Sequence, residues 1–339
     1  MAYGPLDANP ISSTIHLTKG TSIWLYVACA FMGLSTAIMA FLTRKRVRGT
    51  RIFHQLATVI LAVSTVNYFS LASNLGSVPV LTTMRREGTR AIWYSRYIDW
   101  IITTPMLLLV LLLATGLPLG DITTILAFNI VMFACLLIGA LISSDYKWGF
   151  FSFAIAAMLY VAYHILSSAR GSARLMGLDW GRTFTRSSGL LVFTWALYPI
   201  CWALSEGGNV MGASGEMIFY SILDILSKPV FLFMHVMAIS KLPYADLGLT
   251  SGKYSDPVNS GVGHHHPLGN TTSHARSSVT AHGAGADVAH EHKKSPFGFL
   301  NRKVEHDNQT PMQHSNVAVG SQAPVLNQPT TTTNTAAAV

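Results

Sequence analysis

Charged residues are scarce in this sequence. They make up 11% of its 339 residues, whereas 50% are hydrophobic, and the mean hydropathy is +0.39. Soluble domains carry about 25% charged residues, so the composition argues against an ordinary soluble protein and predicts a membrane protein with several spans. The formal net charge of +8 is concentrated between apolar runs. We therefore relate it to membrane topology and expect no nucleic-acid partner.

Cysteine is equally sparse. Cys29, Cys135 and Cys201 each lie inside an apolar run, at spacings that fit neither a disulfide framework nor a zinc site. The helical runs contain no nucleophile–base set, so we do not expect an enzyme. The first twenty residues lack a basic start followed by an apolar core, so we expect no cleavable signal peptide.

Seven apolar runs follow one another, each close to the roughly 20 residues that a helix needs to cross a bilayer. They cover 21–43, 52–75, 92–114, 121–142, 148–167, 188–205 and 216–240. Runs of this length are not barrel strands, so they predict an all-α membrane protein, a seven-transmembrane-helix bundle in lipid. We expect an extracellular N-terminal segment 1–20, a helical domain 21–241 and a C-terminal tail 242–339.

Basic residues in two loops predict the orientation of the bundle, because excess lysine and arginine marks the cytoplasmic side. The two loops follow the first and fifth runs and carry Arg44, Lys45, Arg46, Arg48 and Arg51, then Arg170, Arg174, Arg182 and Arg186. The N-terminus is therefore expected outside and the C-terminus inside. The tail is rich in polar residues, glycine and proline without an apolar period, and we expect it to be disordered in the cytoplasm.

Two runs carry ionisable residues at membrane depth. The seventh contains Asp224 and Lys228, four residues apart, and the third contains Arg96, Asp99 and Thr103 at helical spacing. Such residues are costly in a bilayer and indicate a functional site. An ion pair that only fixes packing is the alternative, but two carboxylates and two cations in so uncharged a bundle favour chemistry. Lys228 offers an amine for a Schiff base, with Asp224 as its counter-ion.

Flat side chains and prolines accompany these charges. Next to a membrane lysine, they suit the walls of a pocket for a long, rigid, apolar conjugated aldehyde. They are Trp100 and Pro105 in the third run, and Trp195, Tyr198, Pro199 and Trp202 in the sixth.

Three motifs resemble those of the microbial (type 1) rhodopsins: RYIDWIITTP at 96–105, WALYPICW at 195–202 and LDILSK at 223–228. Pro229 and the SEGGN turn at 205–209 resemble the fungal branch of that family, which includes relatives of bacteriorhodopsin. The resemblance covers all seven runs and leaves out the tail. It implies a retinal-binding photoreceptor, which we expect in the plasma membrane.

The resemblance also implies a role for each matching residue. Lys228 would hold all-trans retinal as a protonated Schiff base, with Asp99 as primary counter-ion and proton acceptor and Asp224 as second counter-ion. Two anions beside the imine favour its protonated form. Arg96 would lie on the extracellular side of Asp99. The other implied roles are proton release by Glu206 and Glu216, hydrogen bonds from Thr103 to Asp99 and from Tyr68 and Tyr198 to Asp224, and pocket walls formed by Trp100, Trp195, Met132, Pro199 and Trp202.

Four positions depart from the pumping members of that family. Val110 stands where many pumps carry the carboxylic acid that returns a proton to the imine, so we expect slow reprotonation from bulk water. Asn129 replaces a carboxylic acid of archaeal members but can still hydrogen-bond Thr104. Leu136 replaces a glycine near the retinal ring, and Phe151 replaces a pocket tryptophan.

His235 is a candidate replacement for the missing donor. It lies seven residues past Lys228, two turns along the same helix face, and histidine exchanges protons near neutral pH. The alternative is a histidine that caps the helix or reaches the interface. His164, near the inner end of the fifth run, is a weaker candidate.

Two functions stay open, and the sequence slightly favours the first. A slow outward proton pump is favoured by Asp99, Arg96, Glu206 and Glu216. Val110 instead favours a photosensor that signals to an unknown cytoplasmic partner.

Other functions are disfavoured. Asp99 argues against inward chloride transport, and the lack of Asn at 99 and Gln at 110 argues against sodium transport. A G-protein-coupled receptor would carry other motifs in its third and seventh helices. Dimers and trimers both occur among microbial rhodopsins, so a homo-oligomer is left open.

Overall fold

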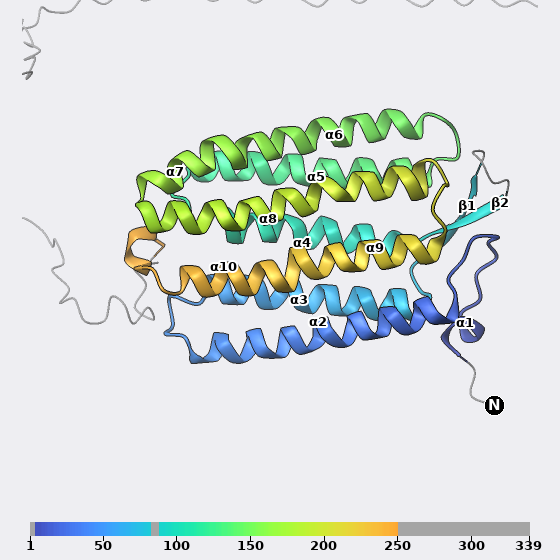
Figure 1. Ribbon diagram of the computed structural model, residues 1–339, viewed down its shortest axis with the longest axis horizontal. Helices are drawn as coiled ribbons and strands as arrows, with labels where there is room; N and C mark the ends of the chain where they lie inside the picture. The colour runs from blue at the N-terminus through green and yellow to red at the C-terminus, as the bar shows by residue number, and fades with distance from the viewer. Residues whose placement is uncertain (1–3, 83–87, 250–339) are drawn as a thin grey trace, which may run out of the picture. The chain divides into compact units, whose positions relative to one another are not determined.

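The computed structural model describes residues 4–82 and 88–249, which form a bundle of long helices (Figure 1). The predicted tail from residue 250 onward lies outside the described residues. Seven helical spans in the described part are long and apolar enough to cross a membrane, so the predicted all-α, seven-helix membrane fold is confirmed. The first four are α2 (Lys19–Lys45), α3 (Ile52–Ala72), α4 (Tyr94–Leu112) and α5 (Leu119–Leu141).

The last three spans each contain a π-helical segment. The fifth span joins α6 (Lys147–His164) to α7 (Arg170–Leu175), and the sixth is α8 (Leu178–Trp202) with a π-helical end at Ala203–Gly207. The seventh joins α9 (Ala213–Ile225) to α10 (Phe231–Ile239) through Leu226–Val230. That segment contains Lys228 and Pro229. Proline has no N–H to donate, and π-helical segments often occur at functional sites.

The large apolar side chains of the bundle face outward as well as inward. On α2, exposed residues recur every three or four positions, at the spacing of one helix face, and the smaller Ala28 and Ser35 are buried. The exposed set is Ile23, Val27, Phe31, Leu34, Ile38 and Phe41. Such a surface suits lipid. α4 lies in the middle, since 61% of its most apolar window is buried, against 22% for the fifth span.

A small β-hairpin lies at one end of the bundle, the same end as the short helix α1 (Pro5–Ala8) (Figure 1). Strands β1 (Val78–Thr82) and β2 (Gly88–Ile92) pair antiparallel, and Ile15 joins Arg90 through one bridge. The sequence analysis did not predict this hairpin. We call the end of the bundle that carries the hairpin the hairpin end. The opposite end carries the α2–α3 loop at 46–51 and the α7–α8 turn at 176–177, and we call it the basic end. Which end faces the cytoplasm stays a prediction.

The sixth span begins at Leu178, ten residues earlier than the predicted 188. The expected basic loop is therefore mostly helix, and α7 and α8 are joined by a turn of two residues. Gly177 makes this turn with φ 141°, a conformation that favours glycine. The apolar run began only at 188 because the first part of α8 carries Arg182 and Arg186. Hydropathy therefore did not indicate that the helix begins at Leu178.

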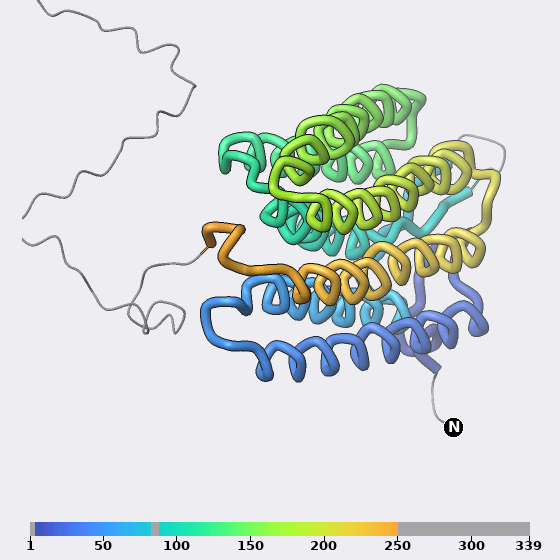
Figure 2. Tube along the Cα trace, turned by 60° about the vertical axis from the view of Figure 1, so that its left-hand side comes forward, coloured from blue at the N-terminus to red at the C-terminus, as the bar shows by residue number. Residues whose placement is uncertain are grey.

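The chain continues past the predicted domain boundary at 241 with a short 3-10 helix at Tyr244–Leu247. Figure 2 shows this segment against the basic end of the bundle. The Tyr244 ring packs edge-on against Phe53, with centroids 6.4 Å apart. The Trp180 indole N–H donates to Asp246 at 3.2 Å. The first residues after 241 thus belong to the packed body.

Candidate functional site

The ammonium group of Lys228 lies between two carboxylates inside the bundle. Lys228 is fully buried, and Asp99 and Asp224 are 2% and 1% exposed. Lys228 Nζ is paired with Asp99 Oδ2 and lies 3.4 Å from Asp224 Oδ1. A charge so far from water is tolerated when it is paired and hydrogen-bonded. The structure thus brings together three of the four charges that the sequence singled out, and the fourth, Arg96, lies in a second cluster.

Asp224 is held by three donors from three helices. Tyr68 of α3 donates to Oδ2 at 2.9 Å, and Tyr198 of α8 donates to Oδ1 at 2.6 Å. Both contacts agree with the expected hydrogen bonds. The indole N–H of Trp100 on α4 adds a third bond to Oδ1 at 3.2 Å. The Asp224 carboxylate is therefore tied to the surrounding helices on both oxygens.

Asp99 has the expected partner, Thr103, and a second one that was not expected. The Thr103 hydroxyl donates to the main-chain carbonyl of Asp99 at 2.8 Å, a common bond for threonine inside a helix, and not to its carboxylate. The carboxylate accepts from Ser64 of α3 at 3.0 Å. The sequence analysis missed Ser64. Its position four residues before Tyr68, on the same helix face, was a usable signal.

Aromatic rings enclose the charged centre. The Trp100 ring centroid lies 5.1 Å from Tyr198, 5.4 Å from Phe133 and 5.0 Å from Tyr220. A small cavity of about 10 Å³ lies nearby, lined by Met132, Phe133, Leu136, Met158, Trp195, Tyr198 and Pro199. Its walls are apolar and flat, which is the chemistry expected around a conjugated aldehyde, but the space itself is far smaller than such a molecule.

The other residues predicted for this pocket lie behind the side chains that line the cavity. Trp202 stacks on Phe151 with centroids 5.0 Å apart and planes at 17°, and its indole N–H donates to the Leu136 carbonyl at 3.2 Å. Thr104 donates to Asn129 Oδ1 at 2.7 Å, in agreement with the expected α4–α5 link. Pro105 follows Thr104 within α4 but is not among the residues that line the small cavity.

A second cluster of buried charges lies toward the hairpin end. Arg96 Nη1 contacts Glu216 Oε1 at 2.6 Å and Glu206 Oε1 at 3.7 Å. The Tyr97 hydroxyl donates to Glu206 Oε2. Arg90 of β2 contacts the other oxygen of Glu216 at 2.5 Å. Glu206 and Glu216 therefore meet as expected, with Arg96 between them.

Sequence reasoning missed two cations of this cluster. Arg90 falls between two predicted spans, where a solvated loop would be expected, but it is 1% exposed and also donates to Asn209 Oδ1 and the Met211 carbonyl, each at 2.8 Å. Lys147, at the start of α6, is 4% exposed, and its ammonium lies 3.4 Å from the Glu206 carbonyl and 3.5 Å from the Gly207 carbonyl. The sequence indicated Lys147 only by its position directly before an apolar run.

On the other side of Lys228, toward the basic end, His235 is fully buried. Its Nε2 lies 3.3 Å from the Val110 carbonyl and its Nδ1 lies 2.8 Å from the Ser187 hydroxyl. It therefore neither caps the helix nor reaches the interface. His164 instead packs against Tyr160 near the outer surface of α6, with ring centroids 4.4 Å apart.

Known proteins share this arrangement of helices. The family of bacteriorhodopsin-like proteins matches residues 19–242. Protein FDD123 of Trametes versicolor is 45% identical over 256 residues, which cover 76% of this chain and 90% of the relative. Opsin-like protein carO of Fusarium fujikuroi is 39% identical, over 72% of this chain and 82% of the relative.

Solved structures of light-driven pumps also match. The proton pump of Coccomyxa subellipsoidea has a TM-score of 0.64 and 29% identity, covering 66% of this chain and 98% of that one. The proton pump of Leptosphaeria maculans has a TM-score of 0.64 and 27% identity, covering 69% and 98%. Halorhodopsin, a chloride pump, has a TM-score of 0.61 and 26% identity, covering 67% and 97%. These similar structures thus include pumps for different ions.

Proposed function

Because the chain belongs to the bacteriorhodopsin-like family, as a fungal-type microbial rhodopsin, we propose that it is a retinal-binding, outward light-driven proton pump. The family consists of light-driven pumps and sensors rather than classical enzymes. The observation that carries the proposal is the contact of the buried Lys228 Nζ with the buried carboxylates of Asp99 and Asp224. We place the protein in the plasma membrane, with its N-terminus outside.

The family implies a retinal chromophore, and we propose the all-trans isomer. Lys228 would hold it covalently, between Trp100 and Trp195, with Met132 and Pro199 completing the pocket. When bound, retinal supplies light absorption and a change of shape at the Lys228 nitrogen. The flat, apolar walls of the cavity and the buried amine both fit such a group.

The proton on Lys228 Nζ has two carboxylates nearby, and we assign its transfer to Asp99. Asp224 already accepts from Tyr68, Tyr198 and Trp100. Asp99 accepts from Ser64 on one oxygen, and its other oxygen contacts the lysine. Asp99 is therefore the less saturated acceptor and the nearer one. Asp224 remains as the second counter-ion.

We assign proton release to Glu206 in preference to Glu216. Both oxygens of Glu216 contact guanidinium groups, from Arg90 and Arg96, and a carboxylate between two cations is stabilised as an anion. Glu206 is held by Tyr97 and by a longer contact to Arg96, and its Oε1 has no hydrogen-bond partner among the described residues. Arg96, one helical turn before Asp99, is positioned to respond to the charge of that residue.

We assign the return of the proton to His235, because Val110 has no group that can donate. A carbonyl only accepts hydrogen bonds, so contact with the Val110 carbonyl requires the hydrogen on Nε2, and Nδ1 then accepts from Ser187. A relay would take up a proton at Nδ1 and give up the hydrogen on Nε2, which leaves His235 neutral as its other tautomer. Water between Nε2 and Lys228, two helical turns away, would have to carry the released proton. This route is slower than donation by a carboxylic acid, since a neutral imidazole is a weak acid.

The alternative is a photosensor without net transport. The observation that favours it is the apolar burial of Val110 at the donor position, because slow return of the proton prolongs the light-activated state. In that case a cytoplasmic partner would bind the tail or the basic end.

The deciding experiment is the light-driven pH change outside cells that express the protein and are supplied with all-trans retinal. A pump acidifies the medium for as long as the light is on, and a protonophore or Lys228→Ala abolishes the change. Light-induced absorption changes without net acidification would support the sensor. Sustained alkalinisation would contradict both outward transport and the proposed orientation.

A further inference from the structure

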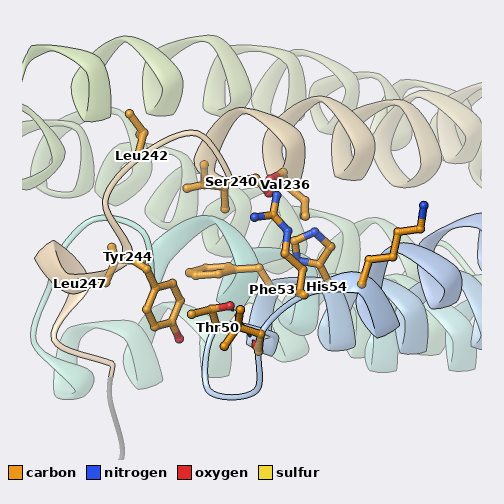
Figure 3. A pocket seen from close by; sticks show the side chains of 12 residues that line it. Thr50, Phe53, His54, Val236, Ser240, Leu242, Tyr244 and Leu247 are labelled. Carbon is orange, nitrogen blue, oxygen red and sulfur yellow. Dashed lines mark hydrogen bonds between the residues drawn. The ribbon is translucent and has the colours of Figure 1, made fainter. Parts of the chain in front are cut away.

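A cavity of about 390 Å³ opens at the basic end, away from Lys228 and both carboxylates. It lies between the end of α2, the start of α3, the end of α10 and the 3-10 helix Tyr244–Leu247. Figure 3 shows Thr50, Phe53 and His54 on one side, with Ser240 of the α10 end and Tyr244 around the same space. Its volume is near the lower end of the range of about 300 to 1,000 Å³ for small-molecule pockets.

The side chains that line this cavity include cations but no acid. The cations are Lys45 and Arg46, and His54 lines the cavity together with hydroxyl and apolar residues. Arg46 forms no ion pair with any residue that the structure describes, although it lies close enough to act electrostatically on the His54 ring.

His54 supplies an independent indication of a ligand. Its side chain is 94% buried, yet its Nδ1 has no hydrogen-bond partner among the described residues. Buried polar groups normally have a partner. His54 also belongs to the first turn of α3, whose N-cap residue Arg51 makes no side-chain cap. Helix N-termini with free amides attract anions.

We propose that this cavity is a binding site for a phosphate group. Arg46, the His54 ring and the first turn of α3 provide donors suited to phosphate oxygens, and Thr50 adds a hydroxyl. The group would come either from the headgroup of an anionic phospholipid or from free phosphate. The apolar wall formed by Phe53, Ile239 and Leu242 suits the glycerol end of a lipid. A basic loop that served only to orient the protein would not need a cavity with a buried, unpaired histidine.

The test is hydrogen–deuterium exchange of segment 46–56 in the full-length chain without retinal, so its outcome is independent of the proposed pump. The protein is placed in three preparations: phosphatidylcholine nanodiscs, the same nanodiscs with phosphatidic acid, and phosphatidylcholine nanodiscs with inorganic phosphate. At about ten times Kd, a ligand that binds only the closed form slows exchange about tenfold. Slower exchange with phosphatidic acid alone would identify a lipid site, and slower exchange in both arms a general phosphate site.

Matched variants decide whether the effect belongs to the cavity. Arg46→Gln and His54→Gln should each abolish the protection. Arg48→Gln removes the same charge from the same loop but lies outside the cavity lining, and it should keep the protection. No slowing in either phosphate-containing preparation would overturn the proposal. Equal losses in Arg46→Gln and Arg48→Gln would also overturn it, because they would indicate diffuse surface charge.

Discussion

Lys228 and Lys147 are both buried lysines with different partners. Lys228 contacts two carboxylates, whereas Lys147 contacts two main-chain carbonyls. We expect Lys228→Ala to produce no visible absorption band after retinal is added to the purified protein, because the attachment amine is gone. Lys147→Ala, the matched control, should still develop colour. A coloured Lys228→Ala protein that retains covalent retinal after denaturation would refute the attachment site.

The two aspartates near Lys228 differ in their hydrogen bonds, and this difference leads to a second prediction. Asp99→Asn should remove the transient blue shift that reports loss of the proton from Lys228, because the nearer acceptor is missing. Asp224→Asn should retain a transient, with altered colour in the dark. Flash photolysis measures both variants. A transient of unchanged rise time in Asp99→Asn would mean that another group accepts the proton.

His235 allows a third prediction at the residue scale. His235→Phe keeps an aromatic ring but removes both nitrogens, so recovery from the transient should slow about a hundredfold, the lower end of the range for losing an acid–base group. The rise time of the transient should stay unchanged. Val110→Asp should speed recovery, and added azide, a small proton carrier, should restore the rate in His235→Phe.

A separate measurement tests the tautomer of His235 without retinal. Nitrogen NMR of the labelled protein should find the hydrogen on Nε2 and a hydrogen-bonded, unprotonated Nδ1. If the recovery rate of His235→Phe is unchanged, the proton does not return through His235, whether or not Lys228 transfers its proton to Asp99.

At the scale of elements, β2 is attached to the bundle by a buried charge pair. Arg90→Gln leaves Glu216 with Arg96 alone, and breaking a buried ion pair costs about 3–5 kcal/mol. We expect a clear drop in the thermal unfolding midpoint. Arg182→Gln is the matched control, since its pair with Asp179 is largely exposed and such pairs contribute at most about 1 kcal/mol. Equal effects of the two substitutions would contradict the role of Arg90.

The elements themselves differ in how well the sequence predicts them. The seven spans were predictable because an apolar run of about 20 residues has few other interpretations. The hairpin was not, because its strands are five residues long and carry no long alternating pattern. The start of α8 was missed because its charges resemble those of a loop.

The contacts of the site were harder to predict than its residue types. Asp99, Asp224 and Lys228 stand out because charge is rare in this chain. Arg90 pairs with a residue 126 positions away, and Ser64 with one 35 positions away. The spacing of residues within one helix does not indicate contacts between residues so far apart in the sequence. The expected bond from Thr103 to Asp99 is present, but the sequence alone could not say that it joins the main-chain carbonyl and not the carboxylate.

For the whole molecule, the proposed orientation has a direct test. The cysteines of the chain lie in the spans, so a polar thiol reagent should react with cysteines introduced at exposed positions. Ser12→Cys, at the hairpin end, should be labelled on intact cells, whereas Arg48→Cys should react after permeabilisation. The opposite pattern would invert the assignment of the two ends and the direction of transport.

The buried charges of the hairpin end have a consequence for the whole molecule. Arg96 contacts both Glu206 and Glu216, and Arg90 contacts Glu216, so two guanidinium groups meet two carboxylates in this cluster. The four charges balance when both carboxylates are ionised, and the cluster is left with a positive charge when Glu206 holds a proton. If the protein is the proposed pump, loss of that proton to the outside would restore neutrality. The cluster would then act as a store for a single proton that empties without a moving gate.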